Sequence, residues 1–274
     1  SADCFRLNAL FNMMRAVCML KPVSFWFRRF CSRNIVLEKN NYEFVLAGTK
    51  DVDLVVKFLG DHHYKQVPTL ICLGVDYMKI AEMFREDTIK QIKDDCSFYV
   101  REKTTKEVVG VLLAHHMNTD LKEHYTNIAN MFRGDRSYYH WKLFEKLYES
   151  VDVYSMYGVG RILHGRVSSL KKSVQRKGLG LVTADGNGLL SLMILPDERN
   201  LVVAEANGLI SNSMLDKAGY RWLSRINYDE FEVDGYYPFK EVPNKTPHSY
   251  VACRALFLEQ SVHSLRRRAN RNDI

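Results

Sequence analysis

One apolar run near the middle of the chain limits the folds that this sequence can adopt. Residues 108–116 read VVGVLLAHH, with six apolar side chains around a single glycine before the two histidines. A strand with one face in water alternates apolar and polar residues, and this run does not alternate. The run therefore predicts a strand that is buried on both faces of a sheet.

The patterns along the rest of the chain place helices on such a sheet. We predict helices at 51–59, 76–93, 141–153 and 211–218, with a further helix beginning at about Gly178. We predict the other strands at 42–46, 97–101, 161–168, 200–205, 220–228 and 248–258. This order favours an α/β fold with one mixed sheet and helices on both faces.

Composition and cysteine spacing limit the class of protein. The 274 residues are 46% hydrophobic, which is enough for one sizeable core, and the formal net charge is +7. That charge suits a CoA, a nucleotide, a nucleic acid or an acidic membrane. The six cysteines form no C-x-x-C pair and no zinc spacing, which predicts reduced intracellular thiols and no metal site. No run approaches the roughly 18 apolar residues of a membrane span, so we expect no stable membrane insertion.

Basic residues gather at both ends of the chain and suggest its division into parts. We expect a basic extension at 1–40, one domain at 41–258 and a basic tail at 259–274. Residues 19–33 are aromatic, basic and free of acids, which resembles a mitochondrial presequence. The alternative is an untargeted extension on a cytoplasmic protein, and we favour that alternative.

The segment between the strand at 161–168 and the following helix carries the chemistry. It reads LKKSVQRKGLG from Leu170 to Gly180, and it offers backbone N–H groups at a helix N-terminus. Such a turn binds anions, because the helix dipole favours negative charge and glycine lets the backbone approach a phosphate. The alternative is a basic surface loop with two chance glycines, which the loop alone does not exclude.

The sequence of this loop resembles the GNAT superfamily of N-acetyltransferases. Gln175-Arg-Lys-Gly-Leu-Gly180 matches the Q/R-x-x-G-x-G/A signature of that superfamily, and it follows a predicted strand as the signature does. Residues 215–220 (LDKAGY) match the family's helix-to-strand element, usually Y-E-K-L-G-F. The residues around the loop are most similar to those of invertebrate arylalkylamine (dopamine-type) N-acetyltransferases.

The resemblance implies a fold, a cosubstrate and a set of binding residues. The implied fold is the GNAT type, a mixed and mostly antiparallel twisted sheet with helices on both faces. The implied cosubstrate is acetyl-CoA, with the amine attacking the thioester directly. The implied cofactor-binding residues are Ser168, Ser169, Leu170, Gln175, Arg176, Lys177, Gly178, Leu179, Gly180 and Asn207.

The acid–base residues of the family are only partly present. The position of the family's catalytic glutamate holds Val67, and that of its general-acid tyrosine holds Leu215. Of the serine pair in dopamine-type enzymes, Ser211 is retained. His164 matches the first histidine of the family's His-x-His strand, and we take His164 and Ser211 as the candidate catalytic residues. A buried strand histidine without a catalytic role is the alternative for His164, and Glu205 is a less favoured base.

These observations favour an enzyme that moves an acetyl group to a small primary amine of arylalkylamine type. The alternative within the same fold is a CoA-binding protein with weak or lost catalysis, which Val67 and Leu215 suggest. We expect no nucleic-acid partner, because the sequence contains no zinc finger, RNP-type strand or recognition helix. The sequence is compatible with a monomer and with a homodimer.

Overall fold

The computed structural model describes residues 35–180 and 201–257, and these residues build one continuous sheet. The strand order is β1-β2-β3-β4-β5-β6-β8-β7, and every neighbouring pair is antiparallel except the parallel pair β5–β6. The strands are β1 (Ile35–Lys39), β2 (Tyr42–Leu46), β3 (Phe98–Glu102), β4 (Val108–Met117), β5 (Ile162–Leu170), β6 (Leu201–Ala206), β7 (Arg221–Asn227) and β8 (Tyr250–Phe257). This mixed, mostly antiparallel sheet confirms the predicted fold class.

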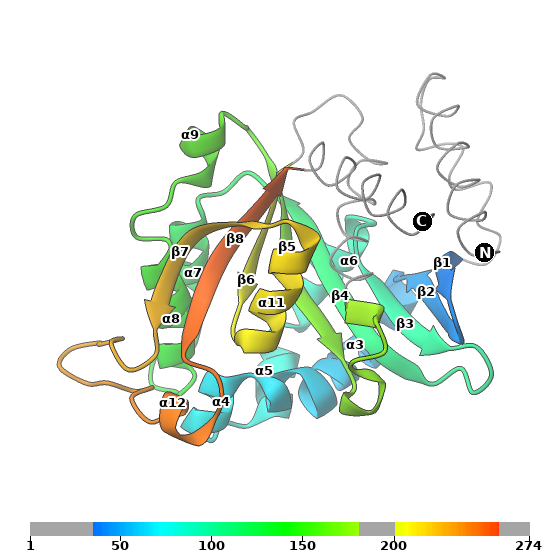
Figure 1. The fold of residues 1–274 in the computed structure, drawn as a ribbon, viewed down its shortest axis with the longest axis horizontal. Coiled ribbons are helices and arrows are strands. Elements are labelled where there is room, and N and C mark those ends of the chain that lie inside the picture. The colour runs from blue at the N-terminus through cyan, green and yellow to red at the C-terminus, as the bar shows by residue number, and fades with distance from the viewer. Residues whose placement is uncertain (1–34, 181–200, 258–274) are drawn as a thin grey trace, which may run out of the picture.

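Helices cover both faces of the sheet, as Figure 1 shows, with α11 in front of β5 and β6 and with α7 and α8 behind the sheet. The α-helices are α3 (Val52–Phe58), α4 (Pro68–Leu73), α5 (Tyr77–Met83), α6 (Arg85–Lys93), α7 (Leu121–Met131), α8 (Tyr138–Leu147), α9 (Val153–Tyr157), α11 (Leu209–Ala218) and α12 (Val242–Lys245). Short 3-10 or π turns are η1 (Thr49–Asp51), η2 (Leu59–His63), η3 (Tyr64–Gln66) and η4 (Lys172–Val174). The helices α3 to α9 share one apolar core with the sheet, and α11 closes a smaller core on the opposite face.

Strand β4 is buried on both faces, as its unbroken apolar run predicts. Val111 and Leu113 pack into the core beneath helices α3 to α9. Their neighbours point the other way, because side chains alternate along a strand: Ala114 packs under α11, and Leu112 packs beside the start of the loop that follows β5. One strand therefore joins the two apolar layers.

Strands β5 and β6 separate after a short parallel pairing. Their last paired residues are Gly165 and Ala204. Beyond them β5 continues along β4 as far as Leu170, whereas β6 continues along β8 as far as Ala206. The sheet thus opens between β5 and β6, and backbone groups on the β6-facing edge of β5 are released from sheet pairing.

The helices α7, α9 and α12 are not among the predicted ones, and three predicted segments differ from the structure. The predicted helix at 76–93 is two helices, because Phe84 leaves the helical conformation and its buried ring packs against Trp141 at 5.0 Å between centroids. The predicted helix at 141–153 begins and ends earlier, as α8. The predicted break at 66–69 contains the start of α4, where Pro68 stands at the first helical turn, a position that tolerates its missing N–H.

The sheet also begins earlier than expected. Strand β1 lies within the segment predicted as a basic extension, and it pairs with β2 through Lys39 opposite Tyr42. The predicted presequence-like segment, the helix after Gly180 and the C-terminal tail lie outside the described residues.

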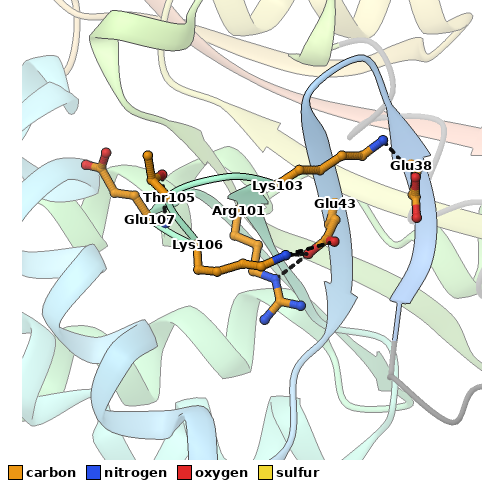
Figure 2. Close-up of polar contacts among 7 residues, drawn as sticks. All are labelled: Glu38, Glu43, Arg101, Lys103, Thr105, Lys106 and Glu107. Carbon is orange, nitrogen blue, oxygen red and sulfur yellow. Dashed lines mark hydrogen bonds and ion pairs between the residues drawn. The ribbon is translucent and has the colours of Figure 1, made fainter.

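An ion-pair network joins β1, β2 and β3 with the turn between β3 and β4, as Figure 2 shows. Glu43 on β2 is 7% exposed, and its carboxylate accepts from Arg101 Nε at 2.6 Å and from Lys106 Nζ at 3.2 Å. The Arg101 hydrogen bond outweighs burial and lowers the pKa of Glu43. This buried and paired glutamate is separated from the opening between β5 and β6 by the strands β3 and β4. It shows that a buried carboxylate can have a purely structural role in this fold.

Candidate active site

A narrow cavity lies where β5 and β6 separate, between the sheet and the helices α7 and α8. Arg166 and Val167 line it from β5, and Glu205 and Asn207 line it from the end of β6, each pair just beyond the last paired residues of the two strands. The remaining lining residues come from η2, η3, α7 and α8 and from the residue before α4: His63, Tyr64, Val67, Tyr125, His140, Trp141 and Phe144. The volume of the cavity that water can reach is about 30 Å³, which is room for one or two water molecules.

Glu205 and His164 form a buried pair at this opening. The imidazole Nε2 lies 3.0 Å from both carboxylate oxygens, and the two side chains are 0% (His164) and 4% (Glu205) exposed. The hydroxyl of Tyr148 also donates to the carboxylate. Glu205 lines the cavity, whereas His164 is absent from its walls, so the histidine lies behind the carboxylate.

The surroundings keep Glu205 ionised. Burial by itself raises the pKa of this carboxyl group, but the nearby His164 and the hydrogen bonds from His164, Tyr148 and Tyr125 outweigh burial and lower the pKa overall. Burial raises the pKa of Tyr125 and of Tyr148 well above the ordinary value, so both phenols stay protonated and act as donors. The cavity therefore holds a fixed negative charge at neutral pH.

Two further histidines contact the ring of His164. His115 and His124 lie with their ring centroids 5.5 Å and 6.0 Å from that of His164. Burial lowers the pKa of His115 to about 2 and that of His124 to about 4, so both rings are neutral at pH 7. Nδ1 of His115, Nε2 of His124 and Nδ1 of His164 have no hydrogen-bond partner within the described residues. The neutral rings of His115 and His124 thus pack against His164, behind the Glu205 carboxylate.

Arg166 enters the cavity wall through a β-bulge. Val167 pairs with Leu113 and Gly165 pairs with Ala114, so Arg166 is the extra residue of β5. Its guanidinium forms an ion pair with Asp87 of α6 through Nη1 and lies 4.0 Å from the ring centroid of Phe84. Burial lowers the pKa of Arg166, but a guanidinium remains protonated in proteins. The cavity therefore also holds a fixed positive charge.

The loop after β5 has the backbone of an anion cradle. Arg176 and Gly178 adopt positive φ angles of 63° and 74°, which alternate with ordinary angles and turn successive N–H groups toward one side. Among the described residues, the N–H groups of Arg176, Lys177 and Gly178 make no hydrogen bond. Helical structure begins at Leu179, so these groups also lie at a helix N-terminus. The main chain of this loop is therefore arranged as an anion-binding turn is.

Gln175, the first residue of the signature, ties this loop to the opening of the sheet. Its Nε2 donates to the carbonyl of Leu170 at 3.1 Å and to Oε1 of Gln66 at 2.6 Å. Gln66 Nε2 also donates to the Leu170 carbonyl, at 3.3 Å. The two glutamines therefore hold the loop, the end of β5 and η3 together.

The strand before the loop turns alternate amides toward the opening. Lys171 N–H bonds the Val109 carbonyl on the β4 side, at 2.8 Å. Because N–H groups alternate along an antiparallel strand, the amides of Ser168 and Leu170 point away from β4, into the opening, and that of Ser169 points toward β4. Of the three predicted binding residues on this strand, two therefore have amides that face the opening.

The basic side chains of the loop differ in how free they are. Lys171 forms an ion pair with Glu107 at 2.5 Å, so its charge is partly neutralised. Lys172, Arg176 and Lys177 are exposed, and Lys39 of β1 donates to the Gly178 carbonyl at 3.3 Å. Cations thus surround the cradle, but the groups that would contact a phosphate directly are main-chain amides.

Ser211 and Asn207 differ in their relation to the cavity. Ser211 Oγ donates to the Gly208 carbonyl at 2.9 Å and accepts from the Gly208 N–H at 3.2 Å, so its hydroxyl caps α11. It is not among the residues that line the cavity. Asn207 does line the cavity, and its Oδ1 has no hydrogen-bond partner within the described residues.

Several residues of the cavity are missed or ranked low by sequence reasoning. Glu205 is placed below His164, although Glu205 faces the cavity and His164 does not. Tyr125 comes from α7, which the sequence analysis does not predict. The signal for α7 is nevertheless in the sequence: Asp120 caps the helix by accepting from Glu123 N–H at 2.8 Å, and apolar residues recur every three or four positions after it.

Neither a metal-binding cluster nor a membrane-spanning helix is found in the described residues. In the ranges 35–180 and 201–257, no cluster of three or more histidine, cysteine, aspartate or glutamate side chains is arranged to hold a metal ion. The helices of the same ranges are all too short or too polar to cross a membrane.

Comparisons with known proteins are informative at the level of structure. No family model matches the chain, and no curated protein matches it in sequence. Arylalkylamine N-acetyltransferase 2 from Aedes aegypti superposes with a TM-score of 0.66 at 17% identity, over 80% of this chain and 100% of the other. The apo form of a mutant agmatine N-acetyltransferase gives a TM-score of 0.68 at 16% identity, over 80% and 100% of the two chains.

A third match agrees with these two. The polyamine N-acetyltransferase of Drosophila melanogaster gives a TM-score of 0.66 at 16% identity, over 79% of this chain and 99% of the other. All three matches span nearly the whole length of the solved chains. The fold of this chain is therefore that of the GNAT N-acetyltransferases, and insect arylalkylamine N-acetyltransferases are among the structures that share it.

Proposed function

We propose that this protein is an acyl-CoA-dependent N-acetyltransferase that transfers an acetyl group from acetyl-CoA to a small primary amine. The observation that carries the proposal is the position of Glu205, a buried carboxylate at the point where β5 and β6 separate. The anion cradle at Arg176 to Gly178 supports it from the other end of β5. The structural likeness to amine N-acetyltransferases agrees with both.

The binding of acetyl-CoA would rest on the main chain of β5 and its loop. The N–H groups of Arg176, Lys177 and Gly178 would hold the diphosphate, because oriented amides stabilise anions without a specific side chain. The amides of Ser168 and Leu170 would bind the pantetheine arm and the thioester carbonyl at the opening of the sheet. When bound, acetyl-CoA supplies the acyl group, which passes directly from sulfur to the amine nitrogen.

Glu205 would act as the general base. An amine arrives largely as an ammonium ion at neutral pH and must lose a proton before its nitrogen can attack a carbonyl carbon. The Glu205 carboxylate faces the cavity and can take that proton. His164 holds the carboxylate in place by donating from Nε2, and the neutral rings of His115 and His124 contact His164. His164 is thus a positioning residue for Glu205 in this proposal.

The acceptor amine would lie among aromatic side chains. Tyr125, Trp141 and Phe144 line the cavity together with Tyr64. Aromatic walls favour flat, apolar substrates and suit an arylalkyl group. The cavity is narrower than such a group, so these side chains must move apart as the acceptor enters.

The position of Val67 favours the alternative of a CoA-binding protein without turnover. Val67 lines the cavity where the family resemblance places a catalytic glutamate, and Leu215 is buried under the sheet where it places a tyrosine. Glu205 offers a carboxylate in the same cavity, however, and this is the reason for preferring an active enzyme.

The decisive experiment measures both binding and turnover. Acetyl-CoA affinity is measured by calorimetry, and CoA release is followed with thiol reagent in the presence of dopamine, tyramine, serotonin, agmatine and spermidine. We expect micromolar binding and amine-dependent release of CoA. Binding of acetyl-CoA without release by any amine would support the non-catalytic alternative, and absence of binding would contradict both.

A further inference from the structure

The cavity carries two fixed charges of opposite sign. Glu205 and Arg166 both line it, and they come from the two strands that separate at this point. His63 and His140 also line it, but burial lowers the pKa of His63 to about 4 and that of His140 to about 3. At pH 7 both imidazoles are neutral, so the anion and the cation are the charges that a substrate in the cavity meets.

Hydrogen-bonding groups beside Arg166 are left without partners in the protein. Nη1 of Arg166 is used by Asp87, but Nη2 has no hydrogen-bond partner within the described residues, and the side chain is only 8% exposed. Trp141 is 5% exposed, and its Nε1 also has no partner in the same ranges. The guanidinium carbon lies 5.9 Å from a ring centroid of Trp141, and both side chains line the cavity. Buried donors without acceptors are unfavourable unless a ligand supplies an oxygen.

The end of β6 contributes hydrogen-bond acceptors to the cavity. Asn207 follows β6, and its Oδ1 has no hydrogen-bond partner within the described residues. The Glu205 carboxylate lies two positions earlier, on β6 itself. The cavity thus presents acceptors for an ammonium group and donors for an oxyanion. The bulge in β5 at Arg166 is what turns the guanidinium into the cavity wall.

We infer that the acceptor amine of this enzyme also carries a carboxylate, which Arg166 and Trp141 bind while Glu205 and Asn207 receive the amine. This inference rests on the proposed function and names its class of substrate: amino acids rather than simple amines. A carboxylate on the acyl group of a dicarboxylic acyl-CoA has the same chemistry. The acceptor is preferred because Arg166 shares the cavity with the Glu205 base.

The test compares acceptors that differ only in a carboxylate. kcat/KM is measured with acetyl-CoA for tyrosine against tyramine, for tryptophan against tryptamine and for arginine against agmatine. We expect the acid-bearing member of at least one pair to be about 10-fold to 100-fold better, the range for a hydrogen-bonded charged group. Equal or better turnover of the plain amine in every pair would overturn the inference while leaving the proposed function intact. Absence of turnover with all six acceptors would contradict the proposed function.

Two variants locate the preference. Trp141→Phe keeps an aromatic ring and removes the N–H, so it should lower kcat/KM for the acid several-fold more than it lowers kcat/KM for the plain amine. Trp222→Phe is the matched control, because Trp222 also lies against an arginine, Arg254, at 3.5 Å from its ring, but on β7 and outside the cavity. An equal effect of the two variants on the preference, or an equal loss with the acid and with the plain amine in Trp141→Phe, would overturn the role of the indole.

A direct test of the guanidinium uses Arg166→Gln together with Asp87→Asn, so that no carboxylate is left unpaired beside the cavity. We expect this double variant to lose the preference for the acid, with folding checked by its melting temperature. A separate measurement tests the alternative that the carboxylate belongs to the acyl group: kcat/KM is compared for succinyl-CoA and butyryl-CoA, with tyramine as the acceptor. A preference for succinyl-CoA that Trp141→Phe removes, without any preference among the acceptors, would overturn the assignment of the carboxylate to the amine.

Discussion

The loop after β5 and the cavity both adjoin the opening between β5 and β6. The loop is built from main-chain amides, whereas the cavity is built from buried side chains. The loop offers main-chain amides that point outward, with exposed cations around them. The cavity offers side chains that are almost completely buried, among them Glu205 and Arg166. One region depends on the conformation of consecutive residues, and the other depends on what distant segments bring together.

This difference predicts how each region tolerates substitution. A main-chain site survives a change of side chain as long as the backbone angles are kept, but it fails when a side chain blocks those angles. A buried side-chain site fails when one charged or hydrogen-bonding group is removed, because its neighbours are then left without partners. We therefore expect the largest effect from a change in the cavity and the smallest from a change in an exposed side chain of the loop.

Glu205→Gln tests the cavity and should have the largest effect. The amide still accepts hydrogen bonds but takes no proton, so we expect kcat/KM to fall by about 10²-fold to 10⁴-fold with little change in acetyl-CoA affinity. Glu43→Gln is the matched control, since Glu43 is also a buried and paired carboxylate but lies on β2, away from the cavity. Activity retained in Glu205→Gln, or lost equally in both variants, would contradict the assignment of the base.

Gly178→Val tests the loop. A β-branched residue is strained at a φ of +74°, and its side chain would fill the space of a phosphate, so acetyl-CoA affinity should fall by at least about tenfold. Gly158→Val is the control for strain alone, because Gly158 has a φ of +61°, lies outside the loop and has no atom within 4 Å of the position that a Cβ would occupy. Calorimetric binding that is unchanged in Gly178→Val would argue against the cradle.

Acid should destabilise the cavity region. The folded-state pKa is about 4 for His63 and about 3 for His140, and both lie below the unfolded value of about 6.5. The unfolded chain therefore binds more protons below pH 6.5, and stability should fall as the pH drops from 6.5 toward 4. Urea midpoints at pH 7, 6, 5 and 4 measure the slope, which His140→Gln should make shallower. A midpoint that stays constant over this range would contradict the neutral buried histidines.

Arg176→Ala should have the smallest effect. The Arg176 side chain is exposed, so its charge is screened by salt, and we expect acetyl-CoA affinity to fall only about twofold to fivefold, with less loss at high salt. Lys172→Ala should behave in the same way, since Lys172 is also exposed. A loss as large as that of Gly178→Val would show that side chains rather than amides hold the diphosphate.

The strands were easier to predict than the helices. The predicted strands from 97–101 to 248–258 each correspond to a strand of the structure within about two residues at each end. The signal is clearest for β4 and β6, because these buried strands carry continuous apolar runs. The predicted helix at 76–93 is divided in the structure because burial of the Phe84 ring overrides a continuous helical pattern. Strand β1 was missed because its residues follow a strongly basic segment.

The sequence by itself determined the loop, because Gln175, Gly178 and Gly180 lie within one short stretch of the chain whose backbone conformation depends on local steric rules. Only the tertiary structure decided the cavity. Glu205 and Arg166 become neighbours because β5 and β6 pair and then separate, and a bulge turns the arginine inward. Trp141 reaches them from a helix on the face of the sheet. Long-range pairing and packing set these positions, and no local pattern of residue types specifies them.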